Sequence, residues 1–259
     1  DLGTALLVRK PRGVEPTAAG QRLHDHARSI LRAVETATDD VRSSDDRLAG
    51  RINIGMPYSA MRVIGPGVLR RMYEAHPMAK VVLTEALSAN TYTQLLHGET
   101  DLALIFNPPP DAETDRIPIL EEDLICAGVP ALLGAADQPI RFADLADLPM
   151  ALLMSGALAR ALVDHPGALS RIEPHARYQL ASVGATIGVA EAGLACVLAP
   201  RIVVAELLDR GCLIARPVID PTPRRTLSLV SRHGDTPGRL RDAVAATILD
   251  ETRTAVQSG

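Results

Sequence analysis

From residue 51 onward the sequence alternates between short apolar segments and longer helical ones, and this alternation limits the possible folds more than any other feature. The predicted strands of a first series are residues 51–57, 79–86 and 101–106, with helices at 60–76 and 89–98 between them. A second series has strands at 150–155, 178–182 and 195–200, each followed by a helical segment. Strands that alternate with crossover helices predict an α/β fold with a parallel sheet, and two such series predict two lobes.

Two lobes built in this way require the chain to cross between them twice. The best candidates for the crossings are the loop NPPPDAETD, residues 107–115, and the segment RPVIDPTPRR, residues 216–225. Strand 226–232 and a terminal helix at 238–255 then return to the first lobe. We therefore expect one two-lobed domain over residues 51–259, with lobe I formed by about 51–108 and 225–259 and lobe II by about 118–216.

The segment TALLVRKPRGVEP, residues 4–16, concentrates positive charge at a predicted turn. Proline fixes one torsion of the turn KPRG and glycine supplies a positive φ, so the segment is a candidate β-hairpin. Arg9, Lys10 and Arg12 surround its tip, although the formal net charge of the whole chain is -4. Taken alone, three basic side chains at a turn are more typical of a solvated loop than of a binding surface.

A long helix is predicted from Thr17, a favourable N-cap, to about Val41, with no internal proline. Its apolar positions form one narrow stripe, which consists of Leu23, Ala27, Ile30, Val34, Ala37 and Val41. The stripe has the heptad spacing of a dimerisation seam over close to three repeats. It fits packing on the protein's own body and packing on a second copy equally well. Polar residues 42–50 then form a hinge, so that 17–47 is predicted to be a linker helix.

Composition excludes several classes of protein. The chain has 259 residues, 47% of them hydrophobic, which suffices for the cores of two domains. Aromatic residues make up only 2%, so no base-stacking platform for single-stranded nucleic acid is expected. We expect no membrane span and no signal peptide, because neither pattern occurs in the sequence. Cys126, Cys196 and Cys212 lie in or beside apolar runs and are predicted to be buried thiols in a reducing compartment.

Serine recurs where predicted strands run into helices, at Ser59, Ser88, Ser155 and Ser182. The carboxyl ends of parallel strands and the free N–H groups of helix N-termini both favour an anionic ligand at such junctions. Each serine fits a helix cap equally well, because serine is a preferred N-cap residue. We predict that the junctions surround a small, anionic ligand between the lobes, with contacts from Ser59, Ala60, Ser88, Asn90, Phe106, Asn107, Ser155 and Ser182.

The sequence contains no recognised catalytic motif. G-x-S-x-G, H-E-x-x-H, the phosphate-binding G-x-x-x-x-G-K-[ST] and paired Cys-x-x-Cys are all absent from it. His24 and His26 are the nearest pair of histidines, and two residues apart on a helix they point to different sides. We therefore expect a protein that is not an enzyme and that carries neither a cofactor nor a metal.

With these segments placed, the chain resembles the LysR-type bacterial transcriptional regulators. The resemblance rests on LLVRKPRGVEPTAAGQRLHDHARSIL near the N-terminus, on HGETDLAL in the first lobe and on GVAEAGLACVLAP in the second. It covers essentially the whole chain, and the spacing R-x-x-R-G-V-x-x-T-x-A-G is its most specific part. The nitrogen-assimilation branch of the family is a weaker further resemblance. The helix-turn-helix of the family lies upstream of these residues and is absent from this sequence.

The resemblance implies a periplasmic-binding-protein-like effector domain that follows a winged-helix wing, residues 1–16, and a linker helix. Arg9, Lys10, Arg12 and Thr17 would then face double-stranded promoter DNA, whereas the acidic bulk would face away from it. The expected partners are DNA, an anionic small-molecule effector and further copies in a homodimer or homotetramer, in the cytoplasm and without a membrane. A periplasmic-type solute-binding protein and an enzyme on the same α/β plan are the alternatives.

Overall fold

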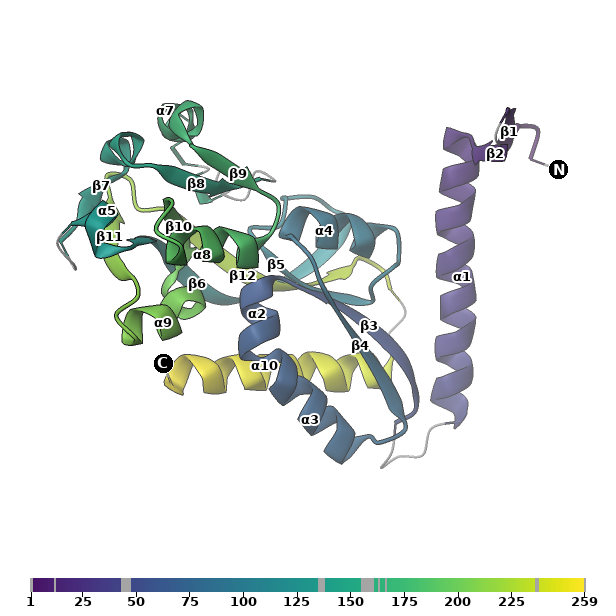
Figure 1. Ribbon diagram of the computed structural model, residues 1–259. Helices are drawn as coiled ribbons and strands as arrows, with labels where there is room; N and C mark the ends of the chain where they lie inside the picture. The colour runs from purple at the N-terminus through teal and green to yellow at the C-terminus, as the bar shows by residue number, and fades with distance from the viewer. Residues whose placement is uncertain are drawn as a thin grey trace.

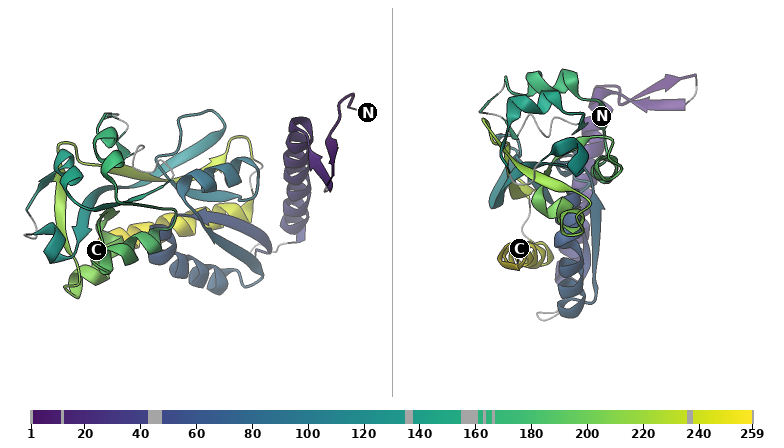
Figure 2. Two further views of the ribbon diagram at one scale, coloured as in Figure 1. Left: turned by 45° about the horizontal axis from the view of Figure 1, so that its top comes forward. Right: turned by 60° about the vertical axis from the view of Figure 1, so that its left-hand side comes forward.

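The structure is a computed structural model that describes residues 2–11, 13–42, 48–134, 138–154, 161–162, 164–165, 167–235 and 238–258. It consists of a two-lobed α/β body, a long helix beside the body and a small hairpin at the end of that helix (Figure 1). Figure 2 shows from two further sides that this helix stands next to the body and is not part of either lobe. The expected α/β class and the two-lobed plan are therefore confirmed.

The N-terminal hairpin consists of β1 (Leu7–Lys10) and β2 (Gly13–Pro16), which pair antiparallel with Lys10 opposite Gly13. Gly13 has a φ of 138°, a value that side chains other than hydrogen rarely allow. The predicted hairpin is thus confirmed. All described residues of its two strands are exposed.

Helix α1 (Ala18–Arg42) is joined tightly to the hairpin at its first turn. The hydroxyl of Thr17 accepts a hydrogen bond from the N–H of Gly20 at 3.0 Å and donates one to the carbonyl of Ala5 at 2.8 Å. A Cβ atom on Gly20 would lie 1.9 Å from the carbonyl oxygen of Leu6, so only glycine permits this close approach. Thr17 therefore caps the helix as predicted, and also fixes the direction in which the hairpin leaves it.

Lobe I is built on three parallel strands and one antiparallel strand. The strands, in spatial order, are β4 (Ala79–Glu85), β3 (Gly50–Met56), β5 (Leu102–Phe106) and β12 (Arg224–Arg232). Its helices are α2 (Tyr58–Val63), α3 (Gly65–Ala75), α4 (Ser88–Leu96) and the terminal α10 (Arg239–Ser258). The helical segment expected at 60–76 is divided at Ile64, because its Gly-Pro-Gly sequence at 65–67 interrupts the first turns and Pro66 favours the start of a new helix.

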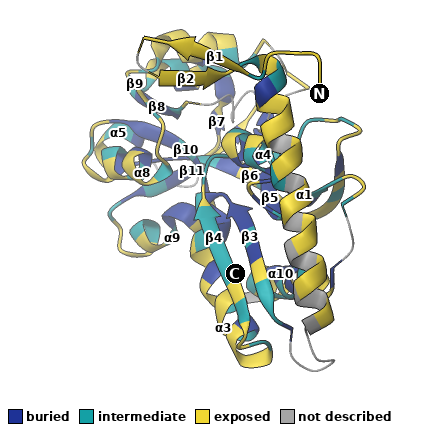
Figure 3. Ribbon diagram, turned by 90° about the vertical axis from the view of Figure 1, so that its right-hand side faces the viewer, coloured by how far each residue is buried: buried dark blue, intermediate teal, exposed yellow. Residues whose placement is uncertain are grey.

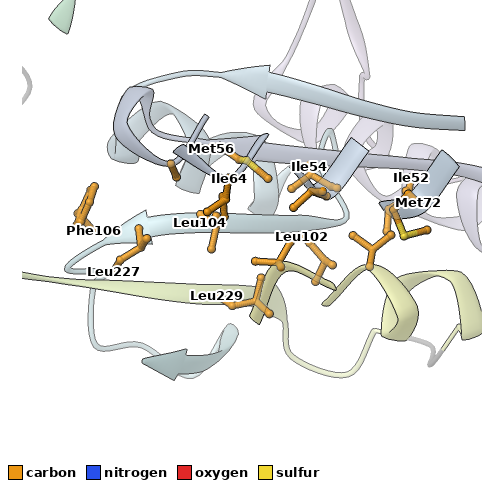
Figure 4. Close-up of a cluster of buried hydrophobic side chains, with 14 residues drawn as sticks. Ile52, Ile54, Met56, Ile64, Met72, Leu102, Leu104, Phe106, Leu227 and Leu229 are labelled. Carbon is orange, nitrogen blue, oxygen red and sulfur yellow. The ribbon is translucent and has the colours of Figure 1, made fainter. Parts of the chain in front are cut away.

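The core of lobe I lies between this sheet and helices α2, α3 and α10. Ile54, Leu104 and Leu229 come from three neighbouring strands, and Val244 and Ile248 cover them from α10. Figure 4 shows Phe106 and Leu227 at one end of this cluster, where the strands reach the boundary between the lobes.

Lobe II repeats the plan with a second parallel set. Its parallel strands are β10 (Cys196–Pro200), β8 (Met150–Leu153) and β9 (Tyr178–Leu180). Two further strands, β11 (Ile214–Ile219) and the short β7 (Ile140–Arg141), pair with each other. Its helical segments are α5 (Pro130–Leu133), η1 (Phe142–Asp147), α7 (Leu169–Ile172), η2 (Glu173–His175), α8 (Val183–Glu191) and α9 (Arg201–Asp209). Phe142, Leu145, Met150 and Ile172 are among its most deeply buried side chains.

One long strand, β6 (Thr114–Gly128), belongs to both lobes. Its first part pairs antiparallel with β12 as far as Asp123, and its second part, from Leu124 on, pairs antiparallel with β10 and β11. The sheets of the two lobes are therefore continuous, and the first crossing lies in the middle of β6, later than the predicted loop at 107–115. The antiparallel strands β6 and β12 add to the expected parallel sets, and β6 was not predicted because alternation detects βα units and not antiparallel hinge strands. No described helix is long and apolar enough to cross a membrane.

Candidate ligand-binding site

A cleft between the lobes, at the carboxyl ends of β3, β5, β8 and β10, is the candidate site. Its volume is about 760 Å³ including the open mouth. The residues that line it are Pro57, Tyr58, Ser59, Leu87, Ser88, Phe106, Leu153, Val183, Thr186, Ile187, Leu198, Ala199, Pro200, Val203 and Arg225. Lobe I supplies three hydroxyls beside three apolar side chains, lobe II supplies mainly apolar side chains, and strand β12 supplies one charge.

The hydroxyl groups of lobe I stand where strands turn into helices. Ser88 is the first residue of α4, and its Oγ accepts a hydrogen bond from the N–H of Phe106 at 3.1 Å, which ties the start of the helix to the end of β5. Ser59 lies in the first turn of α2, only 8% exposed, and its hydroxyl makes no hydrogen bond to any described residue. Of these two serines, Ser88 is thus already hydrogen-bonded, whereas the hydroxyl of Ser59 is available to a ligand in the cleft.

Arg225 carries the charge of the cleft. Its Nε donates to Glu122 Oε1 at 2.7 Å and its Nη2 lies 2.5 Å from the same oxygen. The carbon at the centre of its guanidinium lies 3.5 Å from the centroid of the Phe106 ring. Only 18% of the Arg225 side chain is exposed, and burial lowers its pKa from the ordinary value, against the opposite effect of Glu122. Because arginine keeps its proton in proteins, this is a desolvated, fixed cation.

The register of the hinge strands explains this arrangement. Arg225 pairs directly with Glu122 across β12 and β6, and Leu227, two residues further on, pairs with Phe106 of β5. Residues two apart on a strand point to the same face, so the ring of Phe106 is a neighbour of the guanidinium on the adjacent strand.

The structure brings together only some of the residues predicted for this site. Ser59, Ser88 and Phe106 line the cleft, whereas Ala60 is buried in the core of lobe I. Ser155 lies outside the described residues.

The remaining predicted residues do not line the cleft. Asn90 is exposed on α4. Asn107 adopts a positive φ of 45° and its Oδ1 accepts the N–H of Thr226 at 2.7 Å, so it joins β5 to β12. Ser182 is exposed and caps α8, since its Oγ accepts the N–H of Ala185 at 3.3 Å. The cap alternative thus describes Ser182, whereas neither Ser59 nor Ser88 caps its helix.

A polar bridge joins lobe I to lobe II. Arg62 of α2 donates to Glu206 of α9 at 2.7 Å and to the hydroxyl of Tyr58 at 3.4 Å. Hydrogen bonds to Tyr58 and to Glu206 raise the pKa of Arg62. The ring of Tyr58 also packs on the apolar cluster of lobe II, so this short segment of lobe I holds both lobes together.

Breaking this bridge is expected to loosen the contact between the lobes slightly. An exposed ion pair of this kind is worth about 0.2–1 kcal/mol, so Glu206→Ala should speed amide hydrogen exchange in residues 57–64 by about two- to fivefold. Glu191→Ala, which removes an exposed carboxylate of α8 that pairs with no described residue, is the control and should leave that exchange unchanged. Equal exchange in the two variants would show that the bridge does not restrain the lobes.

The cysteines are not part of this site. Cys126 and Cys196 lie on the neighbouring strands β6 and β10 with no exposed surface. The contact with Cys196 and burial both raise the pKa of Cys126 well above its usual range, which keeps this thiol protonated and unreactive. Cys212 is only partly buried, so the prediction of buried thiols is wrong there. Among the described residues, no three His, Cys, Asp or Glu side chains gather as a metal site requires.

The basic hairpin and helix α1 stand beside the two-lobed body, and none of their described residues lines the cleft. Arg9 is exposed, Lys10 pairs with Glu15 at 3.4 Å, and Arg12 lies outside the described residues. All six seam residues of α1 are exposed, and Figure 3 shows the exposed surface running along the helix.

The fold and the cleft define a two-lobed α/β ligand-binding domain with the architecture of periplasmic binding proteins. Residues 45–253 match the family model described as the LysR substrate binding domain. The chain belongs to the LysR family of transcriptional regulators.

Relatives and solved structures agree with this membership. The chain is 32% identical to the HTH-type transcriptional regulator BbuR of Bordetella bronchiseptica over 260 aligned residues, which cover 100% of this chain and 79% of that protein. It is 29% identical to the nitrogen assimilation regulatory protein nac of Klebsiella aerogenes, over 78% of this chain and 65% of that protein. The relatives are thus bacterial transcriptional regulators.

Among solved structures, the C206 mutant of OxyR from Corynebacterium glutamicum matches with a TM-score of 0.67 and 25% identity, over 99% of this chain and 80% of that one. The effector binding domain of QuiR in complex with shikimate matches with a TM-score of 0.68 and 16% identity, over 80% of this chain and 98% of that one. The second likeness shows the shared two-lobed fold.

Proposed function

We propose that this regulator senses a small-molecule effector in the cleft between its lobes and converts occupancy of the cleft into altered DNA binding by its oligomer. The observation that carries the proposal is the lining of the cleft, to which both lobes and the hinge strand β12 contribute. A ligand held there contacts both lobes at once and therefore favours one relative placement of them over others.

The same cleft supports a binding function over an enzymatic one. The described residues of its lining contribute three serine and threonine hydroxyls, one tyrosine and one arginine, and among them is no carboxylate or histidine that could exchange a proton with a substrate. We accordingly propose a cytoplasmic regulator without catalytic activity, with promoter DNA and further copies of itself as partners. Within the family, a DNA-binding role accounts for the basic hairpin, which the solute-binding alternative leaves unexplained.

A cleft-filling substitution tests the proposal. Val183→Trp adds bulk to a partly buried residue that lines the cleft, whereas Ala185→Trp adds the same bulk at an exposed position of the same helix. In a library of metabolites, a true effector at about a hundredfold excess over its Kd adds about 2.7 kcal/mol of stability, a shift in Tm of about 5–10 °C. We expect this shift, and a ligand-dependent change in DNA retention, in the wild type and in Ala185→Trp but not in Val183→Trp.

Two results would contradict the proposed function. A ligand that stabilises Val183→Trp as well as it stabilises the wild type binds elsewhere and contradicts the proposal. A library without any stabilising compound also counts against it.

A further inference from the structure

We propose that lobe II carries a second ligand site, separate from the cleft, that binds inorganic phosphate or the phosphate group of a small metabolite. The site is a cavity of about 570 Å³, including its open mouth, between η1, the segment 165–171 and the end of β11. None of the described residues that line this cavity also lines the cleft. A ligand here would contact lobe II alone, so the site goes beyond the effector function proposed above.

The first observation is that two parallel strands end at this cavity. Strands β7 and β11 pair in parallel, with Ile219 opposite Arg141, and both strands end at these residues. The next residues along the chain, Phe142 and Asp220, line the cavity. Open α/β sheets bind their ligands at the carboxyl ends of parallel strands. The cavity therefore occupies the same kind of position in lobe II as the cleft occupies between the lobes.

The second observation is a positive charge without a counter-ion. Arg171 and His165 line the cavity and are exposed, and their side chains make no hydrogen bond or ion pair with any described residue. Asp220 is the one carboxylate among the described lining residues, and its Oδ2 already lies 4.0 Å from Nε of Arg141. The charge of Arg171 is therefore uncompensated, and the lining favours an anion over a cation.

The third observation is that both donor groups stand on a hydrogen-bonded backbone. The N–H of His165 donates to the carbonyl of Leu162 at 2.8 Å, and the N–H of Ala168 donates to the carbonyl of His165 at 2.9 Å. The N–H of Arg171 then donates to the carbonyl of Ala168 at 3.1 Å. Ile172, the next residue, is fully buried in the core of lobe II. A backbone that is ordered before binding loses little further entropy when a ligand arrives.

The chemistry of the two donor groups indicates a phosphate. The guanidinium of Arg171 has five N–H donors in a planar fork, and the imidazole of His165 adds at least one donor from a second residue. A phosphate group has three acceptor oxygens and can engage both side chains, whereas the fork alone takes up both oxygens of a carboxylate. Phe142 and Pro221 form an apolar part of the lining, against which a small body attached to the phosphate can pack.

Isothermal titration of the full chain at constant ionic strength tests the inference. Inorganic phosphate and glycerol 3-phosphate are the probes, and glycerol and glycine are the neutral and zwitterionic controls. We expect at least one of the two phosphates to bind with a Kd of about 1 mM or lower, and both controls to bind at least about tenfold more weakly. Tighter binding of glycerol 3-phosphate would identify a phosphorylated metabolite as the source of the phosphate, and binding no tighter than that of inorganic phosphate would identify the free ion.

Variants then locate the phosphate. Arg171→Gln should weaken its binding about tenfold and His165→Gln about threefold, and both side chains are exposed, so neither change should disturb folding. The matched control Arg177→Gln removes the same charge from an exposed residue of lobe II outside the lining and should retain the affinity. Asp220→Asn removes a like charge and should strengthen binding about twofold or more, since asparagine also tolerates the φ of 53° at this position.

Four results would overturn the inference: neither phosphate binds, glycine binds as tightly as a phosphate, Arg171→Gln keeps the affinity of the wild type, or Asp220→Asn binds more weakly. The cleft variant Val183→Trp should bind phosphate as tightly as the wild type does, because it changes no residue of this cavity. Loss of phosphate binding in Val183→Trp would place the phosphate in the cleft and would also overturn the inference. The proposed function of the cleft is tested separately, by its own library of metabolites.

Discussion

Replacing Ile30 and Val34 of helix α1 by glutamate is expected to convert the oligomer into monomers. The two side chains are 65% and 59% exposed in the single chain, and the same stripe includes Val41, which is 87% exposed. A helix of 25 residues is about 38 Å long, and an apolar stripe of that length on a soluble protein marks an interface. Two buried, unpaired charges in such a seam should weaken self-association by about a hundredfold or more.

The direction of the stripe supports a second copy over the protein's own body. The guanidinium of Arg28 lies 3.5 Å from Glu99 of the body, so this side of α1 faces lobe I. Ile30 follows two residues later, about 200° further round the helix, and therefore points away from that contact. The heptad pattern fits packing on the protein's own body and packing on a second copy equally well. The direction of the stripe favours the second copy, and dimerisation remains a prediction.

Sedimentation equilibrium at micromolar concentration measures the effect. The control is Gln21→Glu with Arg22→Gln, which changes the net charge by the same amount on residues outside the stripe. We expect one chain's mass for the seam variant and at least twice that mass for the control and the wild type. An unchanged mass in the seam variant would mean that other surfaces hold the oligomer together.

The sequence predicted the repeating βα units of the fold well, because each unit carries its own periodic signal. Strand β3 buries Ile52 and every residue from Ile54 to Met56, and β5 is apolar throughout, with all five residues buried. Strand β6 was missed because residues 114–123, its part in lobe I, include six polar or charged residues and all but Thr114 are partly or fully exposed. Periodicity depends on a uniform environment along the element, and a strand that passes from one lobe to the other has none.

The candidate site was harder to predict, because the position of its charged group, Arg225, depends on the register between two strands. Glu122 and Arg225 are 103 residues apart and meet only because β6 and β12 pair in one particular register. The search for serines at strand–helix junctions found Ser59 and Ser88, since any ligand at strand ends meets those junctions. It could not separate them from Ser182, which is an exposed helix cap. The signal that was available is RR at 224–225, where two arginines directly precede the strand predicted at 226–232.

Replacing Arg9, Lys10 and Arg12 of the hairpin by alanine is expected to weaken binding to all DNA duplexes by similar factors. The close fit of Gly20 against Leu6 and the cap at Thr17 fix the hairpin at the end of α1, so the exposed Arg9 and Lys10 lie together at one end of the molecule. Each phosphate contact on B-DNA contributes about 0.9 to the slope of log K against log salt, so loss of three contacts lowers the slope by up to about 2.7.

Salt titrations of DNA binding, on two duplexes of unrelated sequence, decide this prediction. The control replaces Arg70, Arg171 and Arg177, which are exposed on the two lobes, by alanine and changes the net charge equally. A slope that falls only in the hairpin variant places the hairpin on the phosphate backbone, because a general charge effect would appear in both variants. Glu15 pairs with Lys10 and competes with a phosphate for it, so Glu15→Gln should strengthen binding. A slope that is unchanged in the hairpin variant would leave these three residues as a solvated turn.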